Sequence, residues 1–112
     1  AALAADTQVW LGPCIGPQSF EVGEGVRAAF LAALPDAAQC FVSVPGGVGK
    51  WLAHLPKLAR QRLQAMGLLN IYGNDGAAPW CTVGNASQVF SHRRDAALLG
   101  STGRMAACIW KV

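Results

Sequence analysis

The chain has 112 residues, 53% of them hydrophobic and only 13% charged, with a formal net charge of +3. This length suits one domain or part of one, and the hydrophobic content excludes a disordered tail of low hydropathy and high charge. The basic residues are scattered except for two short pairs, which argues against a nucleic-acid-binding protein, and no apolar run reaches the roughly 18 residues of a membrane span. We expect a cytoplasmic protein without nucleic-acid or membrane partners.

The four cysteines are widely spaced and form no Cys-x-x-Cys pair, and no histidine lies at a zinc-finger offset from them. This spacing argues against a closed structural zinc site. An even number allows two disulfides, but a chain this large and apolar does not need covalent staples. We therefore expect reduced core thiols at Cys14, Cys40, Cys81 and Cys108.

The first third of the chain is predicted to form a strand, a rigid loop and a helix. Residues 7–11 are typical of a short buried strand that ends at Gly12-Pro13. A second Gly-Pro follows, so the segment LGPCIGP places two rigid turns around Cys14 and suits a loop held against the wall of a site. Helical spacing predicts a helix over residues 22–34, ended by Pro35, with an apolar series of Val22, Val26, Phe30 and Ala33.

A strand, a turn and a second helix are expected next. Residues 40–44 are rich in β-branched and aromatic types and precede the turn Pro45-Gly46-Gly47, after which Trp51 begins the return. The helix that follows has Pro56 in its first turn and Gly67 as its C-terminal cap. Its apolar stripe consists of Leu55, Leu58, Ala59, Leu63 and Met66.

Three strands are predicted in the last part of the chain, over residues 68–72, 89–93 and 104–111, with a turn-rich loop over residues 73–79. The last strand is apolar on both faces. Such a strand belongs inside a sheet that is covered on each side.

The densest polar cluster is FSHRRD, residues 90–95. Adjacent arginines at a strand end point to opposite faces, so one of Arg93 and Arg94 can bind a phosphate or carboxylate while the other pairs with Asp95 or Glu21. The second interpretation is an Arg–Asp network that holds a buried loop.

Other polar residues carry weaker signals. His92 is a candidate base or metal ligand, but a partly exposed strand residue is the favoured interpretation. His54 has no ligand partner at metal spacing, and we expect no functional role for it. Cys81 follows a loop and could face a cleft, although nothing local lowers its pKa enough for a nucleophile. The sequence around Gly103 and Arg104 is not a P-loop, but it could bind an anion weakly.

Four motifs occur in an order and spacing that resemble the C-terminal half of the laccase-domain proteins. They are LGPCIGP with Phe20-Glu21-Val22-Gly23, then Trp80-Cys81-Thr82, then FSHRRD, and finally TGRMAACIW over residues 102–110. Members of this family are also called multicopper polyphenol oxidoreductases, purine nucleoside phosphorylases and peptidoglycan editing factors. The chain departs from the family pattern at His92, where Tyr is usual, at His54, where Asp is usual, and in a longer connection over residues 96–101.

The resemblance implies phosphate-dependent cleavage of purine nucleosides, with adenosine deamination and phenol oxidation also attributed to members. It implies zinc or copper held by a His, a Cys and a second His in the first half of the family's domain, positions that this chain lacks. An open metal site of this kind can polarise an incoming oxygen ligand. The chain would supply the opposite wall, without a metal ligand or a catalytic residue of its own. The candidates for substrate or phosphate binding are Ser91, Arg93, Arg94 and Arg104, and those for structural support are Glu21, Asp95 and Cys81.

The expected fold is α+β, with mixed β-sheets and flanking helices in a layered arrangement. Residues 1–112 would form the C-terminal half of the family's single domain and pair with a missing N-terminal half or a second chain. The expected ligands of the assembled protein are a purine nucleoside and phosphate. Two alternatives stay open: a copper-dependent polyphenol oxidase, and a non-catalytic fragment or scaffold.

Overall fold

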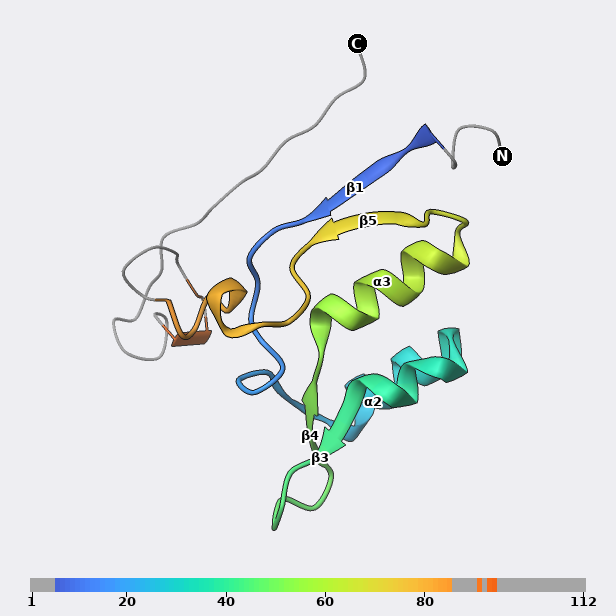
Figure 1. Cartoon of the computed structure of the whole chain (residues 1–112). Helices are drawn as coiled ribbons and strands as arrows, with labels where there is room; N and C mark the ends of the chain where they lie inside the picture. Colours follow the sequence, from blue (N-terminus) through green and yellow to red (C-terminus); the bar gives the residue numbers. More distant parts are fainter. Residues whose placement is uncertain (1–5, 86–90, 92, 95–112) are drawn as a thin grey trace.

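A computed structural model of the chain describes residues 6–85, 91, 93 and 94 (Figure 1). The described residues form a parallel two-stranded sheet, an antiparallel three-stranded sheet and helices, which confirms the α+β class. The elements in chain order are β1 (Gln8–Leu11), β2 (Glu21–Gly23), α2 (Glu24–Ala33), the 3-10 helix η1 (Pro35–Cys40), β3 (Phe41–Ser43), β4 (Lys50–Ala53), α3 (Leu55–Ala65), β5 (Asn70–Gly73) and the 3-10 helix η2 (Ala78–Trp80).

The antiparallel sheet has the order β2-β4-β3, with β4 in the centre. Val22 lies opposite Trp51, and Phe41 lies opposite Ala53. The expected turn between β3 and β4 is present, and Gly46 adopts a φ of 73°, a conformation that favours glycine. The small buried core of the described residues lies between this sheet and the helices, with η1 packed against both α2 and α3. It consists of Val22, Ala37, Cys40, Phe41, Ala53 and Leu58.

The second sheet is the parallel pair of β1 and β5, in which Leu11 lies opposite Gly73. Figure 1 shows the two strands side by side, with α3 next to β5. The expectation of a buried first strand is wrong for this chain, because Trp10 on β1 is 60% exposed and Tyr72 on β5 is 54% exposed. Within the described residues, these two large side chains are therefore open to solvent.

Helix α3 begins at Leu55 as predicted and ends at Ala65, one residue before the end of the predicted apolar stripe at Met66. Pro56 lies in its first turn, and Gly67, with φ of 86°, follows its C-terminus. His54 is the N-cap, and its Nδ1 accepts a hydrogen bond from the main-chain N–H of Lys57 at 3.0 Å. A capping bond of this kind satisfies one of the free N–H groups of the first turn. α3, with 11 residues, is the longest of the described helices. None of the described helices is long and apolar enough to cross a membrane.

Several predicted boundaries move in the structure. The first helix begins at Glu24 instead of Val22, because Val22 pairs with Trp51 in the sheet. The strand expected from residue 40 begins one residue later, because Cys40 ends η1. The strand expected over residues 68–72 is β5, which begins at Asn70, because the turn at Gly67 extends to Leu68, whose N–H bonds back to the carbonyl of Leu63.

The strand predicted over residues 89–93 is wrong at the two positions that the structure describes. Ser91 is irregular, and Arg93 and Arg94 are helical. The N–H of Arg94 donates to Oγ of Ser91, a short-range bond that favours a turn over an extended strand. The other positions of this strand, and the whole of the strand predicted over residues 104–111, lie outside the described residues.

Candidate functional site

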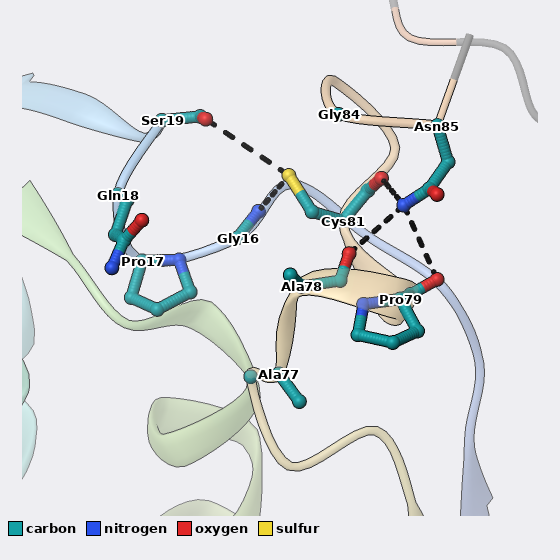
Figure 2. A pocket seen from close by; sticks show the side chains of 11 residues that line it. Gly16, Pro17, Gln18, Ser19, Ala77, Ala78, Pro79, Cys81, Gly84 and Asn85 are labelled. Atoms are coloured by element: carbon teal, nitrogen blue, oxygen red, sulfur yellow. Dashed lines mark hydrogen bonds between the residues drawn. The ribbon is translucent and has the colours of Figure 1, made fainter.

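A cavity of about 670 Å³ lies where the Gly-Pro segment after β1 meets the loop around η2 (Figure 2). Its wall is formed by residues 16–19, residues 76–79, and the turn after η2. The turn contributes Cys81, Gly84 and Asn85. The expectation that Cys81 faces a cleft is therefore confirmed.

The main chain of Cys14 connects the two sides of this cavity. Its N–H donates to the carbonyl of Trp80 at 3.1 Å, and its carbonyl accepts from the N–H of Thr82 at 3.0 Å. Cys14 and Cys81 are therefore partners in an isolated parallel β-bridge. A Cβ on Gly16 would lie 3.0 Å from Sγ of Cys81, so the close approach favours glycine there. The LGPCIGP segment is thus held against the wall of a cavity, as its two turns predict.

The buried side chain of Asn74 joins the segment that carries Cys14 to the loop before η2, a role that the sequence did not predict. The side chain is 1% exposed, and its Nδ2 donates to the carbonyl of Gly12 at 2.9 Å and to Sγ of Cys14 at 3.3 Å. Its Oδ1 accepts from the N–H of Gly76 at 2.9 Å. The available signal was the Asn-Asp-Gly order, since Asn often bonds to the main chain two residues later in a turn.

The thiol of Cys81 lies among hydrogen-bond donors (Figure 2). Its Sγ accepts from the N–H of Gly16 at 3.2 Å and lies 3.9 Å from Oγ of Ser19. Burial alone would raise the pKa of Cys81, but the N–H groups of Gly84, Gly16 and Val83 outweigh it, so the pKa is lowered. The sequence offered no neighbouring base that would lower this pKa; in the structure main-chain N–H groups lower it instead, two from the same turn and one from distant Gly16.

Arg94 and Ser91 support the turn that carries Cys81. Nη1 of Arg94 donates to the main-chain carbonyls of Thr82 and Val83, the latter at 3.2 Å. Ser91 is 6% exposed and accepts from the N–H of Arg94 at 3.3 Å. The arginine thus contacts the outside of the same turn whose N–H groups face the thiol.

Arg93 lies at the other predicted support residue, Glu21. Its Nη1 donates to the main-chain carbonyl of Glu21 at 2.6 Å, and its guanidinium lies 5.2 Å from the ring centre of Phe20. The predicted pairing with a carboxylate is therefore wrong for Arg93 and Glu21, because the contact is made by the backbone. Arg93 remains exposed. The other candidates, His92, Asp95 and Arg104, lie outside the described residues.

The described residues do not fit a metal site. Within residues 6–85, 91, 93 and 94, no three His, Cys, Asp or Glu side chains are grouped closely enough to hold an ion. His54 uses Nδ1 as a helix cap, and burial lowers its pKa. Cys14, Cys40 and Cys81 are free thiols, as expected for reduced cysteines, although only Cys40 is fully buried. Cys108 lies outside the described residues.

A family model described as multi-copper polyphenol oxidoreductase laccase matches residues 1–112. The chain belongs to this family. Relatives of this laccase-family chain include the Escherichia coli (strain K12) purine nucleoside phosphorylase YfiH, which is 44% identical over 103 residues, covering 92% of the chain and 38% of YfiH. A Pseudomonas aeruginosa purine nucleoside phosphorylase is 40% identical over 102 residues, covering 91% of the chain and 38% of that protein.

A solved structure shares the fold of this laccase-family chain. The crystal structure of a Neisseria meningitidis protein assigned to DUF152 aligns with a TM-score of 0.70 and 43% identity. The alignment covers 79% of the chain and 34% of the Neisseria protein. The chain therefore spans little more than a third of the length of these relatives.

Proposed function

We propose that this chain is part of a purine nucleoside phosphorylase, which cleaves adenosine, inosine or guanosine with phosphate to give the free base and ribose 1-phosphate. The observation that carries the proposal is the 40–44% identity, over more than nine tenths of the chain, to relatives that bear this name. Adenosine deamination belongs to the same proposal as a second activity. A cytoplasmic location stays a prediction from the sequence.

The proposed role of the chain is to provide one wall of the substrate site. Two motifs of the family resemblance contribute to the wall of the cavity beside Cys81: LGPCIGP through Gly16 and Pro17, and Trp80-Cys81-Thr82 through Cys81. Arg93 is the exposed one of the two arginines, so it is our candidate for the phosphate. Arg94 and Ser91 would act by holding the turn of Cys81, and Glu21 by holding Arg93 through its carbonyl. Roles for Arg104 and Asp95 stay predictions.

Residues 1–112 are proposed to be the C-terminal half of the family's single domain. The partner would be an N-terminal half or a second chain that supplies the rest of the domain. This proposal is supported by the exposed apolar side chains of the β1–β5 pair, Trp10 at 60% and Leu69 beside β5 at 73%. The zinc or copper of the assembled protein would be held by that other part, where it would act as a Lewis acid.

The test is an assay of base release from inosine and adenosine in the presence of phosphate. The chain is measured alone and after addition of a polypeptide equivalent to the first part of YfiH. We expect hypoxanthine or adenine, with ribose 1-phosphate in equal amount, only from the combination. Turnover by the chain alone would overturn the argument that the metal lies elsewhere, and no turnover by the folded complex would overturn the phosphorylase proposal.

Phenol oxidation is the second candidate, and the description of the matching family favours it. It predicts bound copper and uptake of dioxygen without any need for phosphate. Oxidation of a phenol by a complex that does not cleave nucleosides would support this candidate. If the complex forms but carries neither activity, the chain is a scaffold.

A further inference from the structure

Two free thiols lie next to each other at the wall of the cavity. Cys14 and Cys81 are 67 positions apart in the sequence and are partners in the parallel β-bridge. Neighbouring strands lie about 4.8 Å apart, and a disulfide accepts Cα separations of roughly 4.4–6.8 Å. The backbone therefore presents the two cysteines at a spacing that a disulfide can bridge without a large movement.

Cys81 is the member of the pair that lines the cavity. It is half-buried in the wall of the 670 Å³ cavity, so a small polar molecule can reach its sulfur. The N–H of Gly16 points at Sγ from 3.2 Å, and the hydroxyl of Ser19 lies on the same side (Figure 2). Donors arranged around a sulfur favour the thiolate, which is the nucleophilic form of cysteine.

Cys14 has the opposite environment. Burial raises the pKa of its thiol, the hydrogen bond from Asn74 lowers it, and a charged Cys81 raises it further. The two environments therefore shift the pKa values in opposite directions and favour the thiolate at Cys81 over the thiolate at Cys14.

We propose that Cys81 is a site of modification by hydroperoxides and that Cys14 is the thiol that resolves it into a disulfide. The Cys81 thiolate attacks one oxygen of hydrogen peroxide, the S–O bond forms, the O–O bond breaks, and the hydroxide that leaves takes up a proton as water. Cys14 then attacks the sulfenic sulfur, the S–S bond forms, and the hydroxyl leaves with the Cys14 proton as a second water. Sulfur loses two electrons in total, and peroxide gains them.

The disulfide would change the cavity. It would remove the thiolate from the wall and link the LGPCIGP segment covalently to the turn after η2. Reduction by a dithiol reverses both effects. This inference does not depend on nucleoside cleavage, because it uses only the two thiols and their surroundings.

The experiment uses the protein that contains this chain, assembled as it is isolated, and treats it with a small excess of hydrogen peroxide. Trypsin digestion without reductant is followed by mass spectrometry. The expected product joins the peptide of Cys14 to that of Cys81 and disappears on addition of dithiothreitol. A crosslink of Cys81 to another cysteine, or no oxidation of Cys81, would overturn the proposal. The peptides are distinct, because they end at Arg27 for Cys14, at Lys50 for Cys40 and at Arg93 for Cys81.

Three variants separate the two roles. Cys14→Ser should stop the reaction at a Cys81 sulfenic acid, which dimedone traps, whereas Cys81→Ser should leave Cys14 unoxidised. Cys40→Ala is the matched control, because Cys40 is 2% exposed in the core and its loss should not change the crosslink. Equal oxidation of Cys14 in the Cys81→Ser variant would contradict the assignment.

A measurement on the unmodified protein guards against variants that fail to fold. Iodoacetamide is added to the native protein at neutral pH, and the alkylation rate of each cysteine is followed by mass spectrometry. We expect Cys81 to react at least about tenfold faster than Cys14 and Cys40, because the thiolate is the reacting form. Equal rates, or faster reaction of Cys14, would overturn the proposal.

Discussion

The guanidinium of Arg60 on α3 donates a hydrogen bond to the main-chain carbonyl of Asn74 at 3.1 Å. It also reaches the carbonyls of Ile71 at 3.3 Å and Gly73 at 3.4 Å, so one side chain binds the end of β5 at three points. The side chain of Asn74 in turn bonds to Gly12 and Cys14. Arg60 therefore connects helix α3, through Asn74, to the segment that carries Cys14.

Arg60→Lys should lower the free energy of unfolding by about 2 kcal/mol, since a compact ammonium cannot reach three carbonyls and hydrogen bonds to charged groups contribute roughly 1.5–3 kcal/mol. Urea unfolding followed by circular dichroism would measure the loss. Arg62→Lys on the same helix is the matched control, because Arg62 is exposed and should change stability by less than about 0.5 kcal/mol. Equal effects of the two substitutions would refute the role of Arg60.

Gly73→Ala should destabilise the protein by about 1–3 kcal/mol. Gly73 has φ of 92°, and an added Cβ would lie 2.5 Å from the carbonyl oxygen of Leu11 across the parallel pair. Gly25→Ala in α2 should have the opposite sign and stabilise by about 0.5–1 kcal/mol, because its Cβ meets nothing within 4 Å and alanine favours helix. Thermal unfolding of both variants would show whether Gly73→Ala lowers the stability and Gly25→Ala raises it. An unchanged stability of Gly73→Ala would contradict the prediction and show that the turn can relax.

His54→Ala should cost about 1 kcal/mol of stability through loss of the helix cap, whereas His54→Asp should retain most of it. Burial lowers the pKa of His54, and the positive charge of Lys57 lowers it further, while Asp75 acts in the opposite direction. A lowered pKa means that folding favours the neutral imidazole, whose Nδ1 can accept the bond from Lys57.

The stability that His54 contributes is therefore fully present above its unfolded pKa and is lost as the pH falls through the lower, folded pKa. Denaturant titrations at several pH values between 7.5 and 5 would measure this loss. His54→Asn can accept the same bond without titrating, so the difference between the wild-type and this variant should grow as the pH falls. A difference that stays constant over this range would contradict the prediction.

Arg93→Ala in the assembled protein should raise the KM for phosphate by about tenfold, the factor that corresponds to loss of a charge-assisted hydrogen bond of roughly 1.5 kcal/mol. Arg93→Lys keeps the charge and should retain part of the affinity. Phosphorolysis rates over a range of phosphate concentrations would separate KM from kcat. If KM is unchanged and only stability falls, Arg93 serves the fold through the carbonyl of Glu21 and the ring of Phe20.

Local signals in the sequence predict the parts of this structure that depend on neighbouring residues. Pro35, the turn before β4 and the glycine after α3 each mark a boundary within a few residues of its true place. β2 is missed, because a three-residue strand that leads directly into a helix has the apolar spacing of that helix. Its pairing with β4 depends on residues about thirty positions away.

In the candidate site, too, the features that depend on neighbouring residues were predictable from the sequence, whereas those that depend on distant residues were not. The two Gly-Pro turns indicate a loop against a wall, and the cavity lies there. The environment of Cys81 could be predicted only in part, since the N–H groups of Val83 and Gly84 belong to its own turn but that of Gly16 is 65 positions away. For Arg94, sequence spacing suggested a strand face, but its partners are carbonyls in a turn 11 and 12 residues earlier.

Gly76 and His54 come into close contact at the start of α3. Gly76 has φ of 91°, and a Cβ there would lie 2.5 Å from the imidazole ring of His54. Position 76 is therefore restricted to glycine twice, by its positive φ and by the imidazole beside it. A shorter cap at position 54, such as Asp, would remove only the second restriction, so the tight start of α3 depends on the glycine whichever residue caps the helix.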